Sequence, residues 1–153
     1  SEPVNFLIIG ASVSAMLTGV PSPGHILAER MGAPVTVYAH AGAKLHQVMP
    51  TDKALREDAL VVSVDGFYWY SRFKEDCDKG IETAARLFRV RGARPMILAT
   101  APGGCERINQ YLEEHCRDAC ILVKLEGRLA PPSLHPDRAY MEEVVRAISS
   151  PHR

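Results

Sequence analysis

The chain has 153 residues, of which 46% are hydrophobic and 24% charged, so it has the size and composition of one domain with its own core. Its 18 Lys and Arg balance its 18 Asp and Glu and are spread along the sequence, so we expect no nucleic-acid partner. No apolar run approaches the roughly 18 to 20 residues that span a bilayer. We therefore expect a single soluble domain over residues 1–153, either cytoplasmic or exported after loss of a leader.

Short apolar runs alternate with segments of helical spacing along the chain. We predict five buried strands, at 4–9, 35–38, 60–64, 95–99 and 119–123. We predict helices at about 25–31, 75–90, 106–117 and 138–148, and a loop with a short helix within 39–55. Apolar runs without polar alternation are typical of parallel strands that helices cover on both faces.

This alternation predicts a doubly wound α/β fold. The expected form is a flavodoxin-like three-layer α/β/α sandwich around a five-stranded parallel sheet of order 2-1-3-4-5. In that order, the loops after Ile9 and Val64 face each other across a crevice at the carboxyl ends of strands one and three. We expect a functional site in this crevice.

Ser12 is the candidate nucleophile. It follows the first strand and Gly10, in a segment of small residues that allows a tight turn at the crevice. A serine needs a base within hydrogen-bond reach and donors for the oxyanion. The simpler interpretation is that Ser12 or Ser14 caps the next segment. The glycines form neither a G-x-G-x-x-G nor a Walker motif, which disfavours a third idea, a nucleotide-binding domain.

His135 is the candidate general base. It lies in a proline-rich loop, 131–136, that leads into the last predicted helix. The simpler interpretation is a surface histidine beside a helix start. His40 and His46, which flank Gly42 after the second strand, are reserve candidates.

These segments together resemble the SGNH/GDSL hydrolase superfamily. Residues 6–12 are similar to its first block, with Gly-Ala-Ser where the family usually has Gly-Asp-Ser, and 134–136 are similar to its last block. Residues 41–43 are similar to the block whose glycine N–H joins the oxyanion hole. The resemblance implies a flavodoxin-like esterase, lipase or carbohydrate deacetylase, with Ser12 as nucleophile and His135 as base. The amides of Ser12 and Gly42 would form the oxyanion hole. It implies no metal or organic cofactor, and a small-molecule ester or an acetylated carbohydrate as substrate.

Two blocks depart from the family pattern. The third block, usually Gly-x-Asn-Asp, is replaced by Asp-Gly-Phe-Tyr-Trp at 65–69, and Pro132 stands where the family has the aspartate that orients the histidine. Two hypotheses follow. The chain is either an atypical serine hydrolase that rebuilt its site with Asp65 or a backbone N–H, or a noncatalytic binding or interaction domain with a decayed site.

Asp65 and the aromatic residues after it complete the candidate site. Asp65 could accept a hydrogen bond from Ser12 or orient a histidine, although a carboxylate at a strand end also caps turns. Phe67, Tyr68 and Trp69 could form a substrate-binding wall against an acyl chain or a sugar ring. The alternative is that these rings cap the core beside the third strand.

The four cysteines are too few and too irregularly spaced for a disulfide scaffold or a paired C-x-x-C zinc site. They are either thiols or, in an exported protein, the pairs Cys77–Cys105 and Cys116–Cys120. The glycine-rich turn at 100–105 precedes a predicted helix, but no lysine follows it. It is therefore only weak evidence for a phosphate-binding site.

Overall fold

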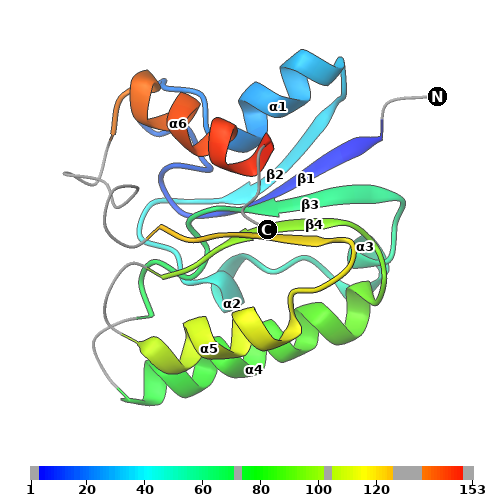
Figure 1. The fold of residues 1–153 in the computed structure, drawn as a ribbon, viewed down its shortest axis with the longest axis vertical. Helices are drawn as coiled ribbons and strands as arrows, with labels where there is room; N and C mark the ends of the chain where they lie inside the picture. Colours follow the sequence, from blue (N-terminus) through cyan, green and yellow to red (C-terminus); the bar gives the residue numbers. More distant parts are fainter. Residues whose placement is uncertain (1–3, 71–73, 102–104, 126–135, 150–153) are drawn as a thin grey trace.

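The structure is a computed structural model that describes residues 4–70, 74–101, 105–125 and 136–149. Five parallel strands form one sheet of order β2-β1-β3-β4-β5 (Figure 1). The strands are β1 (Asn5–Gly10), β2 (Val35–Ala39), β3 (Ala59–Ser63), β4 (Met96–Ala99) and β5 (Cys120–Val123). The helices are α1 (Pro23–Met31), α2 (Leu45–Val48), α3 (Asp52–Leu55), α4 (Lys74–Arg91), α5 (Glu106–His115) and α6 (Arg138–Ser149). The predicted fold and strand order are confirmed.

Helices cover both faces of the sheet. Helices α1 and α6 lie on one face, and α4 and α5 lie on the other with α2 (Figure 1). Side chains of β1 point alternately to the two faces of the sheet. Phe6 and Ile8 pack on the α6 side, and Leu7 and Ile9 pack on the α4 side. In the part of the chain that the structure describes, no helix combines the length and apolarity needed to cross a membrane.

Strand β2 differs from the prediction of a buried strand, which is wrong for this segment. It pairs with β1 along one side, with Val35 opposite Phe6 and Val37 opposite Ile8. Val35 and Val37 are each 40% exposed, and Tyr38 is 37% exposed. The reason is position: β2 is the edge strand, so it has a strand neighbour on one side and helices cover it poorly.

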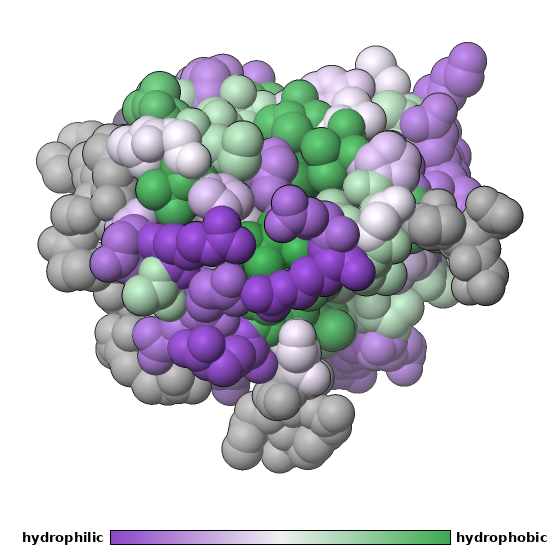
Figure 2. Space-filling model, turned by 90° about the horizontal axis from the view of Figure 1, so that it is seen from above, coloured by the Kyte–Doolittle hydropathy of each residue, from purple (hydrophilic) through white to green (hydrophobic). Residues whose placement is uncertain are grey.

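The face over α1 and α6 mixes polar and apolar residues. Hydrophilic residues cross the middle of this face and hydrophobic residues lie between and beside them (Figure 2). An ion pair, Arg30 to Glu142 at 2.8 Å, links α1 to α6 on the exterior. Because both side chains are partly exposed, this pair contributes little to stability.

Helix α1 is bounded by two caps that the sequence specifies. The Ser22 hydroxyl accepts from the amide of His25 at 3.2 Å, and Pro23 occupies the first helical position, where its missing N–H costs nothing. Gly32 ends the helix with φ of 66°, a left-handed conformation that favours glycine. The Ser22 cap therefore sets where α1 begins, and the Gly32 cap sets where it ends.

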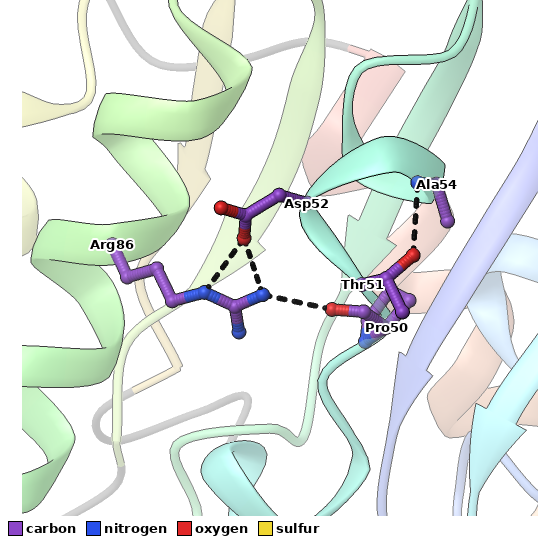
Figure 3. A network of polar contacts seen from close by, with 5 residues as sticks. All are labelled: Pro50, Thr51, Asp52, Ala54 and Arg86. Atoms are coloured by element: carbon purple, nitrogen blue, oxygen red, sulfur yellow. Dashed lines mark hydrogen bonds and ion pairs between the residues drawn. The ribbon is translucent and has the colours of Figure 1, made fainter.

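Helix α4 is anchored to the α3 region by an arginine. Arg86 donates to Asp52 Oδ1 from Nε at 3.0 Å and from a terminal nitrogen at 2.6 Å, and to the Pro50 carbonyl at 3.0 Å (Figure 3). The Thr51 hydroxyl accepts from the amide of Ala54 at 3.2 Å and caps α3. The hydrogen bond from Arg86 lowers the pKa of Asp52.

Arg91, at the end of α4, is fully buried and donates to four carbonyls. Its two terminal nitrogens bond the carbonyl oxygens of Leu55, Glu57, Ala59 and Pro95 at 2.6–3.1 Å. These carbonyls lie where β3 and β4 begin, so one guanidinium ties α4 to the amino-terminal edge of the sheet.

The cysteines form the two pairs that the sequence suggested as an alternative to thiols. Cys77 in α4 is joined to Cys105 at the start of α5, with Cα atoms 5.9 Å apart. Cys116 is joined to Cys120 across the turn into β5, with Cα atoms 5.0 Å apart. The first bond therefore links the two helices that cover one face of the sheet.

Candidate functional site

One buried carboxylate holds the loop that carries Ser12. Residues 11–17 form a turn beyond β1, and Asp65 reaches it from just past the end of β3. Asp65 Oδ1 accepts from the Ser14 hydroxyl at 2.6 Å, and Oδ2 accepts from the amides of Val13 and Ser14 at 3.0 and 3.3 Å. The carboxylate therefore clamps the β1 loop onto β3.

Gly10 is required by this clamp. A Cβ atom at Gly10 would collide with Asp65 Oδ1 and would lie 2.5 Å from the Ser14 hydroxyl. Such separations are below van der Waals contact, so any side chain at position 10 would displace the clamp. Gly10 thus allows Asp65 to approach the β1 loop, a role that was not evident from the sequence motif.

The electrostatics of the clamp follow from its burial. Desolvation raises the pKa of Asp65 above its ordinary value of 3.8. Hydrogen bonds from the Ser14 hydroxyl and from the loop amides favour the ionised form and lower the pKa part of the way back. Ser14 is fully buried, so its hydroxyl donates to Asp65 away from water.

Ser12 itself takes no part in the clamp. Its carbonyl accepts from the amide of Leu17 at 3.1 Å. Among the described residues, neither its amide nor its hydroxyl has a hydrogen-bond partner. The serine is partly exposed, so both groups are available to a ligand.

Ser12 lines a pocket at the carboxyl edge of the sheet. The pocket lies between the ends of β1, β3 and β5 and the starts of α1 and α6, and it encloses about 520 Å³ of empty space with open solvent included. The described residues that line it are Ala11, Ser12, Val13, Pro23, Val64, Asp65, Tyr68, Trp69, Leu125, Pro136, Tyr140, Met141 and Val144.

The predicted aromatic wall divides between two places. Tyr68 and Trp69 line the pocket with Ser12, and their rings contact edge to face with centroids 5.0 Å apart. Phe67 is 1% exposed and packs in the core on the α4 side with Tyr70, which is the alternative that the sequence left open. Successive side chains leave the backbone in different directions, so the three adjacent rings do not all share one wall.

The other candidates lie apart from Ser12 or outside the described residues. Gly42 occupies an exposed turn with φ of 72° and is not among the described residues of the pocket lining. His46 is engaged elsewhere, because Tyr70 accepts from its amide at 2.8 Å and lies 2.7 Å from its Nδ1. His40 is exposed, with Nδ1 3.1 Å from the Ala41 carbonyl. His135 lies outside the described residues.

Two participants were missed by sequence reasoning. Ser14 was considered only as a cap, and the spacing of the residues gives no signal for its buried hydrogen bond with Asp65. Tyr140 lines the pocket from α6, and burial, with smaller contributions from Glu143 and Tyr68, raises its pKa to about 12. Tyr140 therefore stays neutral over the physiological range, and its hydroxyl remains a hydrogen-bond donor.

The fold is similar to that of solved carbohydrate esterases. A family two carbohydrate esterase from Cellvibrio japonicus superposes with a TM-score of 0.62 at 11% identity, over 98% of this chain and 61% of that one. A family two carbohydrate esterase from Clostridium thermocellum, solved with cellohexaose, gives 0.62 at 12% identity, over 98% and 64%. The acetyl xylan esterase Est2A from the rumen bacterium Butyrivibrio proteoclasticus gives 0.59 at 10% identity, over 98% and 63%.

The chain therefore spans less than two thirds of the length of each of these neighbours. At these identities, the likeness establishes the fold alone. No protein-family model matches the sequence, and no curated protein is significantly similar to it.

Proposed function

We propose that this chain carries an esterase-type serine hydrolase site in which Ser12 attacks the carbonyl carbon of an ester. The observation that carries the proposal is the placement of Ser12. Its amide and hydroxyl have no partner among the described residues, and it lines a largely apolar pocket at the switch point between β1 and β3. The fold neighbours are carbohydrate esterases, which supports an acylated carbohydrate as the substrate.

His135 is the proposed base. It is the residue before Pro136 in the sequence, and Pro136 lines the pocket together with Ser12. The imidazole would take the proton of the Ser12 hydroxyl and later deliver it to the departing alcohol.

The proposed ester hydrolysis has two steps, acylation and deacylation of Ser12. Attack by Ser12 Oγ forms a tetrahedral intermediate, whose oxyanion the amide of Ser12 would bind, and its collapse leaves an acyl-serine and the alcohol. Water, deprotonated by the histidine, then releases the acid and restores Ser12. In this proposal, Asp65 positions the turn, since its described contacts are with Val13 and Ser14 rather than with Ser12 or a described histidine.

Labelling with a fluorescent fluorophosphonate tests the proposal without a known substrate. We expect wild-type protein to be labelled and Ser12→Ala and His135→Ala to lose labelling. The matched controls are Thr18→Ala, which removes an exposed hydroxyl from the same loop, and His40→Ala, which removes an exposed histidine. Both controls should label as wild type does. Undiminished labelling of Ser12→Ala would remove Ser12 from the mechanism.

A specific observation favours a second function, a noncatalytic carbohydrate-binding domain. Tyr68 and Trp69 line the pocket at the positions where the SGNH pattern has Asn and Asp, and aromatic rings bind sugars without chemistry. Trp69 is the only tryptophan of the chain, so its fluorescence reports on this site. A change on adding cellohexaose, in folded protein that no fluorophosphonate labels, would favour binding without hydrolysis.

A further inference from the structure

We propose that the pocket beside Ser12 takes the acyl half of the ester, and that this acyl group is a straight aliphatic chain longer than acetyl. This inference rests on the proposed function, because it assigns the two halves of the ester to opposite sides of Ser12. The alcohol half, a sugar or another polar group, stays at the aromatic pair.

The interior of the pocket is aliphatic. Val64 comes from the end of β3, Leu125 from beyond β5 and Val144 from the second turn of α6, and their exposed fractions are 8%, 5% and 2%. Among the described lining residues, Asp65 carries the one charge, and its oxygens already accept from the β1 loop. A methylene chain in this pocket would therefore contact apolar side chains.

A sugar ring does not suit this interior. Val64, Leu125 and Val144 offer no donor or acceptor, so a sugar hydroxyl placed against them would lose its water partners without replacement, which is unfavourable. Tyr68 and Trp69 are half-buried and flank the same pocket, so they retain access to solvent for a polar alcohol. Tyr140 is a neutral phenol near pH 7 and adds no charge to the acyl side.

The aliphatic lining extends further than an acetyl group reaches. The lining on α6 runs from Tyr140 to Val144, four residues that advance about 6 Å along a helix. A longer acyl chain would contact more of this described lining than a single methyl group does, and each contact adds dispersion attraction. Each additional buried methylene is expected to raise kcat/KM about fourfold, from about 0.8 kcal/mol per methylene.

The test compares p-nitrophenyl acetate, butyrate and hexanoate, which share one leaving group. We expect kcat/KM for butyrate to exceed that for acetate by about tenfold or more, and hexanoate to be at least as good as butyrate. Val144→Leu narrows the pocket and should lower the hexanoate-to-acetate ratio. Val145→Leu is the matched control, because Val145 is the next residue of α6, is similarly buried, and is not among the described residues that line the pocket. Its ratio should equal that of wild type.

A binding measurement keeps this inference separate from the proposed function. The fluorescence of Trp69 is followed in Ser12→Ala while neutral hexanamide or acetamide is added, so catalysis is not needed. Tighter binding of hexanamide, weakened by Val144→Leu and not by Val145→Leu, supports an acyl pocket even if no ester is cleaved. Esters cleaved with acetate preferred, or equal binding of both amides, would overturn the inference and leave the hydrolase proposal standing.

Discussion

The substitution Ser14→Ala tests the clamp that Asp65 forms on the loop carrying Ser12. Ser14 is fully buried and its hydroxyl donates to Asp65 Oδ1 at 2.6 Å. The change removes one oxygen and leaves the backbone amide of residue 14 in place. The carboxylate then loses its side-chain donor and keeps its amide donors, so the effect isolates one charge-assisted hydrogen bond.

The magnitude depends on whether Asp65 is ionised. A hydrogen bond to a charged group contributes about 1.5–3 kcal/mol and one between neutral groups about 0.5–1.5 kcal/mol. We therefore expect Ser14→Ala to lower the free energy of unfolding by about 2 kcal/mol with Asp65 ionised, and by about 1 kcal/mol with Asp65 protonated. Denaturant titration across a pH series measures both values.

The sign of the pH dependence follows from linkage. Removing the Ser14 hydroxyl takes away a contact that lowers the pKa of Asp65, so the folded-state pKa rises further above 3.8 in the variant. A raised folded-state pKa means that stability is lost as the pH rises through it. The deficit of Ser14→Ala should therefore be largest above the folded-state pKa of Asp65 and shrink as the pH falls through it.

Ser12→Ala is the matched control for this series. Ser12 is partly exposed, and its hydroxyl has no partner among the described residues. Its removal should change the free energy of unfolding by less than about 0.5 kcal/mol at every pH. Equal stability of the two variants at neutral pH, or a deficit of Ser14→Ala that does not vary with pH, would refute the assignment of this hydrogen bond.

Three further predictions concern the scaffold. Replacing Cys77 and Cys105 by serine opens a loop of 28 residues, and chain entropy predicts a loss of about 3.5 kcal/mol in the free energy of unfolding, measured by denaturant titration. Arg91→Met keeps the apolar stem but strips four carbonyls of their donor, so we expect a loss of at least about 3 kcal/mol by the same method. Arg86→Ala should lower the thermal midpoint slightly at low salt and less at high salt, because the pair with Asp52 is partly exposed.

The sheet could be predicted closely because its signal is local. Each predicted strand and helix matches an observed element to within about two residues, as the apolar runs are bounded by turn residues or helices. The exposure of β2 could not be predicted, because its apolar run looks like that of a central strand. Only the order of strands in space, in which β2 has one neighbour, decides how much of Val37 is covered.

The sequence predicted where the candidate site residues lie better than it predicted which of them contact one another. Ser12 and Asp65 were both expected at the crevice from strand ends, and both line the pocket. That Asp65 bonds Ser14 and not Ser12 depends on how the turn after β1 folds back, which spacing does not encode. The separation of Phe67 from Tyr68 likewise depends on side-chain direction within one short loop.

In the proposed mechanism, the acidic residues considered as partners of the base are engaged elsewhere, which limits the expected rate. Asp65 is bound to the β1 loop, and Asp137 accepts from the amide of Tyr140 at 3.0 Å and so caps α6. In the resemblance to the SGNH pattern, Pro132 stands where that pattern has the orienting aspartate. In a serine protease triad, replacing that acid by its amide lowers kcat by about 10⁴-fold.

We therefore expect fluorophosphonate labelling to be slow, and to be detectable under conditions in which steady-state turnover is weak. Its rate should be measured by following labelled protein over time beside an esterase with a complete Ser-His-Asp triad. A rate that matches the complete triad would contradict the view that no carboxylate assists the base. It would direct attention to Glu126, which lies outside the described residues, and Glu126→Gln would then be the variant that separates an assisted histidine from an unassisted one.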